Sequence, residues 1–304
     1  MAIYGGVEAG GTKFLCIIGS DPDHILNEST IRTTTPEETL PQVIEFFAKA
    51  TEPISGIGIG SFGPIDLNQA SRYFGYITNT PKPGWKNTDF VGTISRALKI
   101  PIVFDTDTNA AGLGEVKWGN AQALDHVLYM TIGTGIGGGF IIKGKPLHGL
   151  LHPEMGHMRI PHDWKQDPFS GICPFHGDCL EGLASGPAIY KRWGSPGEAI
   201  PIDHQAWALE TQYIATGLVN LLCALSPQRI VLGGGVMKRA ELFDAIRIKM
   251  KELSNGYFDH KQLQDDIAEY VVPPKLGRRV GVLGALALAK DTFDPKASDS
   301  IRIT

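Results

Sequence analysis

Cysteine is scarce in this sequence, with four residues among 304. Cys16 and Cys223 lie within apolar runs, where a buried and unreactive thiol is the usual outcome. The other two stand close together near the middle of the chain. So few cysteines exclude the disulfide framework of a small secreted protein.

Long apolar runs and a strong charge imbalance are also lacking. The longest apolar stretch, near residues 218–225, is far shorter than the ~20 residues of a membrane span. The first residues show no basic segment followed by an apolar run, as a signal peptide would. The formal net charge of −4 creates no general attraction to nucleic acid or to an anionic membrane. We therefore expect a cytoplasmic protein with neither of these partners.

What is present is the composition of a globular protein, with 42% apolar and 20% charged residues. Short β-branched runs alternate with helical patterns, which is typical of an α/β fold. Strands are expected at residues 3–7, 13–19, 25–32, 54–60, 102–105, 127–132, 140–142 and 229–232. Helices are expected at residues 36–51, 89–98, 203–225, 241–252 and 282–291.

A strand, a glycine turn and a second strand occur twice, about 120 residues apart, which indicates a duplicated architecture. The length also exceeds what one core usually supports. We predict a small lobe of residues 1–115 and a large lobe of residues 116–304, with a cleft between them. The last helix is expected to pack back on the small lobe.

Three glycine turns are candidates for nucleotide binding, because backbone N–H groups at such turns can converge on an anion. The phosphate candidates are Gly10, Gly11, Thr12 and Lys13 in the first turn, and Thr131, Gly133, Thr134 and Gly135 in the second. The third turn, Gly233, Gly234 and Gly235, follows a buried strand, where a base and ribose could bind. A plain tight turn is the alternative for each.

Two common phosphate motifs do not apply. No segment matches the Walker A pattern. The glycines of residues 133–138 have the spacing of a dinucleotide-binding motif, but an apolar β-like run follows them where that motif needs a helix.

Two carboxylates stand where the strand at residues 102–105 gives way to a helix. Asp105 and Asp107 could cap that helix, which is the structural alternative. A carboxylate there could also act as the general base of a phosphoryl transfer, which needs little covalent chemistry from the protein.

A metal site is predicted in the irregular segment at about residues 150–185. Cys173, His176 and Cys179 lie within seven residues, and His157 can supply a fourth ligand. Four protein ligands leave no open position, so the predicted metal is structural. A chance cluster is the alternative, and His148, His152 or His162 could replace one of these ligands.

These motifs resemble the ROK family of sugar kinases and repressors, and its bacterial fructokinase branch in particular. The resemblance covers nearly the whole chain and rests on residues 8–13, 131–139, 106–109, 154–157 and 173–181. It implies an actin-like ATPase (hexokinase-type) fold, ATP with Mg²⁺, a structural Zn²⁺ and a homodimer. It makes Asp107 the catalytic base and assigns sugar binding to Asp107, Glu154, His157 and Glu181.

Three positions depart from the usual family pattern. Glu8 replaces an aspartate, so a contact there reaches about one methylene further. Thr106 replaces an asparagine of the glucokinase branch, which weakens a glucose assignment, and His176 replaces a cysteine. The last two resemble fructokinases.

The expected activity is that of a phosphotransferase with an alcohol acceptor, which converts fructose and ATP into fructose 6-phosphate and ADP. A kinase for glucose, mannose or an N-acetylhexosamine is the alternative, since few hydrogen bonds decide among these sugars. A sugar-responsive repressor shares the fold, but its DNA-reading module would have to precede the strand at residues 3–7.

Overall fold

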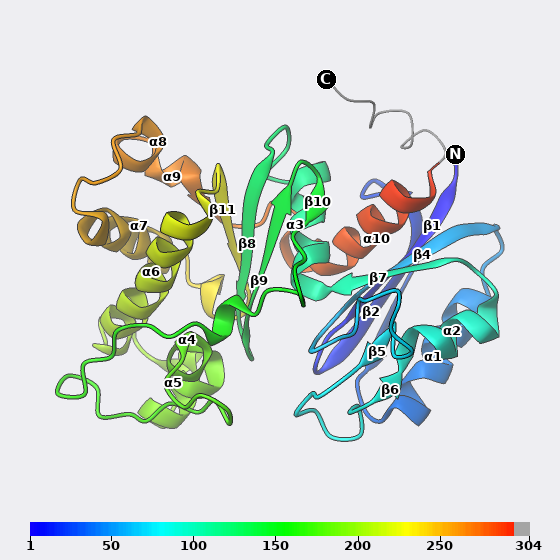
Figure 1. Ribbon diagram of the computed structural model, residues 1–304, viewed down its shortest axis with the longest axis horizontal. Coiled ribbons are helices and arrows are strands. Elements are labelled where there is room, and N and C mark those ends of the chain that lie inside the picture. Colours follow the sequence, from blue (N-terminus) through cyan, green and yellow to red (C-terminus); the bar gives the residue numbers. More distant parts are fainter. Residues whose placement is uncertain (295–304) are drawn as a thin grey trace. The chain divides into compact units, whose positions relative to one another are not determined.

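The computed structural model describes residues 1–294, which form two compact units (Figure 1). Unit 1 contains residues 1–122, 144–152 and 275–294, and unit 2 contains residues 123–143 and 153–274. The lobes predicted at residues 1–115 and 116–304 stay a prediction, because compactness alone does not define domains that fold independently.

Unit 1 is built on a five-stranded sheet in the order β3-β2-β1-β4-β7. Its strands are β1 (Ile3–Ala9), β2 (Lys13–Asp21), β3 (His24–Arg32), β4 (Ile54–Ser61) and β7 (Ile102–Thr106). The first three are antiparallel neighbours, whereas β1, β4 and β7 run parallel. The carboxyl ends of these parallel strands therefore meet at one edge of the sheet.

Alternation along β2 divides the core of unit 1 between the two faces of the sheet. Phe14, Cys16 and Ile18 face the cluster built with α1 (Pro36–Ala48) and α2 (Phe90–Leu98). Leu15 and Ile17 face α10 (Val280–Phe293) instead. This period of two is the ordinary consequence of strand geometry. A short ribbon of β5 (Tyr76–Ile77) and β6 (Thr88–Asp89) precedes α2.

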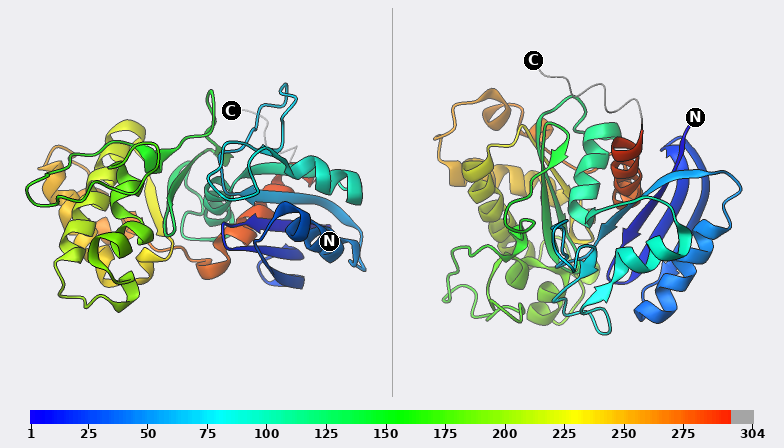
Figure 2. Two further views of the ribbon diagram at one scale, coloured as in Figure 1. Left: turned by 90° about the horizontal axis from the view of Figure 1, so that it is seen from below. Right: turned by 45° about the vertical axis from the view of Figure 1, so that its right-hand side comes forward.

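Glycine allows α10 to lie directly on the sheet and on α3 (Asp107–Trp118). A Cβ at Gly58 of β4 would clash with the backbone carbonyl of Ala285, and one at Gly284 would clash with that of Ala110. Figure 2 shows α10, in red, along the blue strands of unit 1. The carboxylate of Glu115 also accepts hydrogen bonds from the backbone N–H groups of Lys275 and Leu276. These contacts fix the position of α3.

Unit 2 repeats the sheet pattern of unit 1. Its strands are β8 (His126–Ile132), β9 (Ile136–Ile142), β11 (Arg229–Gly233) and β12 (Val271–Val272), in the order β9-β8-β11-β12. An antiparallel hairpin of β8 and β9 is followed by parallel pairing of β8 with β11 and of β11 with β12. The predicted duplicated α/β architecture is therefore confirmed.

The helices of unit 2 are mostly short, apart from two. The long ones are α6 (Ala206–Leu225) and α7 (Glu241–Ser254), which pack on each other. The others are α4 (Leu180–Ala184), α5 (Gly186–Trp193), α8 (Lys261–Gln264), α9 (Ile267–Tyr270) and the 3₁₀ turns η1 (Met155–His157), η2 (Gly197–Ala199) and η3 (Val236–Lys238). Unit 1 holds the two-residue β10 (Lys145–Pro146) and η4 (Gly277–Arg279).

Within residues 1–294, α6 is the one helix long and apolar enough to cross a membrane by length and composition. Half of its apolar window is buried, and it packs on α4 and α7. A core helix of a globular protein passes the same test. The prediction that Cys223 is buried is wrong, because this residue lies on the exposed face of α6, whereas Cys16 is buried as predicted.

Candidate functional site

Asp107 begins α3 at the carboxyl edge of the sheet in unit 1. The helix is capped by its neighbour, since Oγ1 of Thr106 accepts a hydrogen bond from the backbone N–H of Asn109 at 3.1 Å. The carboxylate of Asp107 accepts from the backbone N–H of Thr108 at 2.8 Å. Because Thr106 fulfils the capping role, that role does not explain an acid at position 107.

Burial raises the pKa of the Asp107 carboxyl from 3.8 to about 6, against the lowering effect of its backbone hydrogen bonds. Glu8, near the end of β1, has its pKa raised to about 7, first by burial and second by the negative charge of Asp107. Its Oε2 is buried, and no hydrogen-bond partner for that atom lies within the described part of the chain. Unit 1 therefore holds two coupled carboxylates at one sheet edge.

The first glycine turn follows β1 at the same edge. The backbone N–H of Gly10 donates to the carbonyl of Lys13 at 3.0 Å, which closes the turn. Gly11 and Thr12 are exposed at its tip, and a Cβ on Gly11 would meet nothing within 4 Å. The ammonium of Lys82 donates to the carbonyl of Gly11. The exposed tip thus has two lysines, Lys13 and Lys82, nearby.

The second and third glycine turns come together in unit 2. Gly133 follows β8 and Gly233 ends β11, and these strands are parallel neighbours, with Thr131 opposite Gly233. The backbone N–H of Gly133 donates to the carbonyl of Gly135 at 2.9 Å. Thr134, Gly234 and Gly235 are exposed. Gly234 has a φ of +97°, a conformation that favours glycine.

Glu181, in α4, lies against the second glycine turn. Its Oε2 accepts a hydrogen bond from the backbone N–H of Ile136 at 2.8 Å. A Cβ on Gly135 would stand 2.7 Å from the same oxygen, so glycine is needed here to admit the carboxylate. Glu154 is exposed immediately before η1, and its carbonyl accepts from the N–H of His157 at 3.0 Å.

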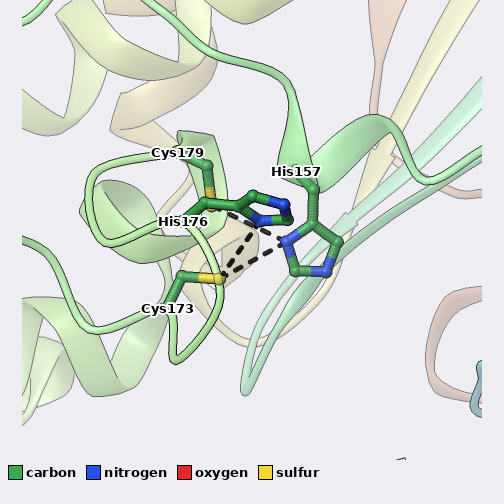
Figure 3. Close-up of side chains that lie close together, drawn as sticks. All are labelled: His157, Cys173, His176 and Cys179. Carbon is green, nitrogen blue, oxygen red and sulfur yellow. Dashed lines mark hydrogen bonds between the residues drawn. The ribbon is translucent and has the colours of Figure 1, made fainter. Parts of the chain in front are cut away.

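The structure brings together the four residues that were predicted to bind metal (Figure 3). Nδ1 of His157 lies 3.6 Å from Sγ of both Cys173 and Cys179. Nδ1 of His176 lies 3.5 Å from Sγ of Cys173. All four donor atoms are within 4.8 Å of one another.

This donor set fits zinc. Zn–S bonds of about 2.3 Å and Zn–N bonds of about 2.0–2.1 Å at tetrahedral angles place sulfur and nitrogen about 3.6 Å apart. The separations between the sulfur and nitrogen atoms match that value. Two thiolates and two imidazoles are also ligands that suit zinc. Nδ1 of His157 points into this cluster, so a metal bound there would leave its Nε2 unused.

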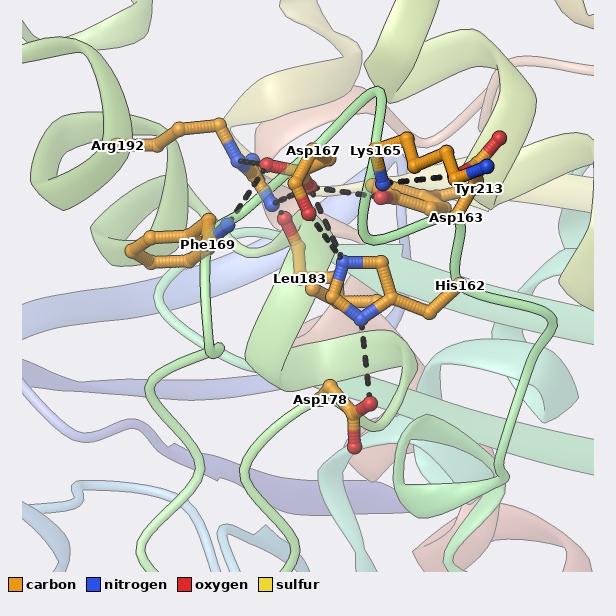
Figure 4. A network of polar contacts seen from close by, with 9 residues as sticks. All are labelled: His162, Asp163, Lys165, Asp167, Phe169, Asp178, Leu183, Arg192 and Tyr213. Atoms are coloured by element: carbon orange, nitrogen blue, oxygen red, sulfur yellow. Dashed lines mark hydrogen bonds and ion pairs between the residues drawn. The ribbon is translucent and has the colours of Figure 1, made fainter.

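His162 does not join this cluster. Figure 4 shows it between two aspartates, with Nε2 donating to the carbonyl of Asp167 at 2.9 Å and Nδ1 3.2 Å from Oδ2 of Asp178. The carboxylate of Asp167 also pairs with Arg192 and accepts from the hydroxyl of Tyr213. The network supports the metal loop, because Asp178 stands between two of its ligands in the sequence.

A cavity of about 610 Å³ opens beside this network, lined in part by Trp164, His162 and Tyr213. The polar atoms of His162 and Tyr213 are already paired with aspartates. None of the predicted site residues lines it.

A model of the ROK family matches residues 4–292 of the chain. The chain belongs to the ROK family. Its sequence is 45% identical over 294 residues to the fructokinase of Zymomonas mobilis, covering 94% of this chain and 96% of that protein. It is 44% identical over 288 residues to the fructokinase of Pediococcus pentosaceus, covering 95% of this chain and 98% of that protein.

Among solved ROK structures, a glucokinase of Streptomyces griseus in complex with glucose and AMPPNP is similar with a TM-score of 0.76. The sequences are 25% identical, and the match covers 95% of this chain and 100% of that one. This agreement, together with the duplicated sheets, confirms the predicted actin-like (hexokinase-type) fold.

Sequence reasoning did not find the buried oxygen of Glu8 that is unpaired within residues 1–294, or the pairing of Asp105 with His148, in this ROK protein. Glu8 stood out only as a departure from the family pattern, and its orphan Oε2 is visible only in the structure. Nε2 of His148 lies 3.0 Å from Oδ2 of Asp105, although the residues are 43 positions apart. Their separation in the sequence could not predict this contact, because it depends on the path of the irregular segment at residues 144–152.

Proposed function

We propose that this ROK protein is an ATP-dependent fructokinase, which transfers the γ-phosphoryl group of ATP to the 6-hydroxyl of fructose. The observation that carries the proposal is the identity of 44–45% to two fructokinases over nearly the whole chain. The replacement of asparagine by Thr106 beside the proposed base, and the histidine at position 176, agree with a fructose rather than a glucose assignment.

Asp107 is the proposed general base. In this mechanism its carboxylate accepts the proton of the 6-hydroxyl, that oxygen forms a bond to the γ-phosphorus, and the bond from phosphorus to the leaving ADP oxygen breaks. The raised pKa of about 6 suits the role, because a base works best when its pKa lies near the working pH.

The glycine turns are the proposed nucleotide site. Gly10, Gly11, Thr12 and Lys13, with Thr131, Gly133, Thr134 and Gly135, are assigned to the phosphates, and Gly233, Gly234 and Gly235 to the base and ribose. Glu8 fits Mg²⁺, since its buried Oε2 has no partner in the described structure and carboxylate oxygen is a preferred ligand. Mg²⁺ bound there would offset negative charge on the phosphates.

We assign sugar binding to Glu154, His157 and Glu181 together with Asp107. Zinc held by His157, Cys173, His176 and Cys179 is proposed as structural. The four candidate zinc ligands lie in η1 and in the segment that joins η1 to α4. Glu154 immediately precedes η1, and Glu181 lies in α4. A fixed loop is required if these side chains are to discriminate between hydroxyl groups.

An assay of the purified protein with ATP and a panel of hexoses tests the activity. We expect kcat/KM to be highest for fructose, with fructose 6-phosphate as the product. A higher value for glucose, mannose or an N-acetylhexosamine would overturn the fructose assignment. Absence of phosphoryl transfer to every sugar, with sugar binding retained, would favour the sugar-responsive repressor.

The pH dependence of this activity follows from the two raised pKa values. Asp107 accepts a proton only when ionised, so kcat/KM should fall as the pH drops below about 6. Protonation of Glu8 should begin to lower it near pH 7.

The stability of the fold should change with pH in the opposite direction. A carboxyl whose pKa is raised by folding stabilises the fold below its unfolded pKa and loses that contribution as pH rises through its folded pKa. Activity that fell at low pH together with the melting temperature would contradict this assignment.

Two glycine substitutions separate the sugar from the nucleotide. Gly135→Val places side-chain atoms against the carboxylate of Glu181 and should raise the KM for fructose about 10- to 100-fold, besides weakening ATP use. Gly235→Val is the matched control, because a Cβ there meets only the Cα of Gly133 at 4.0 Å. It should raise the KM for ATP and leave that for fructose unchanged. If each variant raised the KM for fructose and the KM for ATP by equal factors, the assignment of Gly135 to both sites and of Gly235 to the nucleotide alone would be contradicted.

The cytoplasmic location and the homodimer implied by the resemblance stay predictions. Light scattering of the purified protein tests the oligomeric state, and cell fractionation tests the location.

A further inference from the structure

His148 is held against a buried carboxylate beside the start of α3. Its Nε2 lies 3.0 Å from Oδ2 and 3.2 Å from Oδ1 of Asp105, so Nε2 carries a proton and donates it. Asp105 is 4% exposed, and its Oδ1 also accepts from Nδ2 of Asn109 and from the backbone N–H of Thr106, both at 2.7 Å. These bonds fix the carboxylate, which in turn fixes the imidazole.

The opposite edge of the imidazole is accessible. The side chain of His148 is 39% exposed, and no hydrogen bond from its Nδ1 to another residue occurs within positions 1–294. Since Nε2 is already used, Nδ1 is the atom that a ligand can reach. A histidine that served only to anchor its segment would not need an accessible second nitrogen.

The ring also lies beside the helix turn that carries the proposed catalytic base. Nε2 of His148 is 3.4 Å from Nδ2 of Asn109, which is two residues beyond Asp107 in the first turn of α3. All three residues belong to unit 1. The imidazole of His148 therefore lies against the first turn of α3, the turn that Asp107 begins.

We propose that His148 contacts the sugar substrate, with Nδ1 hydrogen-bonded to a hydroxyl other than the one that is phosphorylated, and that Asp105 is its positioning residue. The inference rests on the proposed kinase function. Asp105 raises the pKa of His148, chiefly through their hydrogen bond. A ring nitrogen held at a fixed position distinguishes sugars that carry a hydroxyl there from those that lack it.

Two amide substitutions separate the two nitrogen atoms. The amide nitrogen of His148→Asn can stand near the position of Nδ1, whereas the longer His148→Gln can reach the position of Nε2. We expect His148→Gln and His148→Ala to raise the KM for fructose about 10- to 100-fold, and His148→Asn to rescue much of that loss. The KM for ATP should be unchanged in all three variants, and kcat should change by a few-fold at most.

A purely anchoring role gives the opposite order, because His148→Gln would keep the bond to Asp105 and His148→Asn would lose it. That order, or a KM for fructose that is the same in all variants, overturns the proposal. Thermal melting of each variant verifies that it is folded. His148→Asn should melt close to the unsubstituted protein, as expected for a partly exposed side chain.

Deoxy analogues of fructose identify the hydroxyl through a double-mutant cycle. Removal of the contacted hydroxyl should raise the KM of the unsubstituted protein but leave that of His148→Ala nearly unchanged. An equal penalty for every analogue in both proteins excludes the contact. If the initial hexose panel shows a preference for another sugar, the fructose assignment fails, and the same variants are tested with the preferred sugar.

Discussion

Replacing Asp107 with Asn is expected to lower kcat by about 10²- to 10⁴-fold, because the amide keeps the shape of the carboxylate but cannot accept the hydroxyl proton. The backbone hydrogen bond from Thr108 can be kept by the amide oxygen, so the start of α3 should be unchanged. Fructose binding, measured by calorimetry without ATP, should weaken by a few-fold at most.

Asp291→Asn provides a matched control for Asp107→Asn. Asp291 is a partly exposed carboxylate in α10 that pairs with Lys117, and the same chemical change there should leave kcat unaltered. Retention of near-normal kcat by Asp107→Asn would remove Asp107 from its proposed role. A loss of sugar binding that matched the loss of rate would instead make it a sugar ligand without a role as base.

Loss of zinc is expected to have the largest effect on stability. The purified protein should contain about one zinc per chain. A metal present at 1,000 times its dissociation constant stabilises a fold by about 4 kcal/mol, which corresponds to roughly 10 °C in melting temperature for a chain of this size. Chelation should therefore lower the melting temperature by about that amount and raise the KM for fructose, because the loop between η1 and α4 would lose its internal link.

Cys179→Ser tests the same site without a chelator, and Cys223→Ser is its control. Cys179 is buried among the four metal-binding candidates, whereas Cys223 is exposed on α6. Only the first substitution should remove zinc and lower the melting temperature. Active protein that contained no zinc when freshly prepared would contradict the proposal. An active-site metal would differ in that its removal abolishes turnover while the melting temperature stays the same.

The features that local sequence determines could be predicted well. Three of the metal-binding candidates fall within residues 173–179, so their spacing alone brings their side chains together. The glycine turns and the start of α3 also depend on a few consecutive residues. The predicted helix at 203–225 begins only at Ala206, because a turn in which the N–H of His204 bonds to the carbonyl of Pro201 precedes it.

The features that depend on the path of the chain could not be predicted from the sequence. The contact of His148 with Asp105 requires the segment at residues 144–152 to return to unit 1. The exposure of Cys223 depends on which side of α6 packs against α7. Because α6 is nearly apolar all round, its sequence does not indicate which side that is. In both cases a long-range contact outweighed the local signal.

The position of α10 has a consequence for synthesis on the ribosome. The face of the first sheet that carries Tyr4 and Ile17 is covered by Val282 and Leu286, which are translated more than 250 residues later. Domains generally fold as they emerge, N-terminal portions first. Here the first strands leave the ribosome early but cannot bury this face until the final helix is released, after all of unit 2 has been translated. The nascent chain therefore carries an exposed apolar sheet for most of its translation, and a stop codon shortly before residue 280 would leave it exposed permanently.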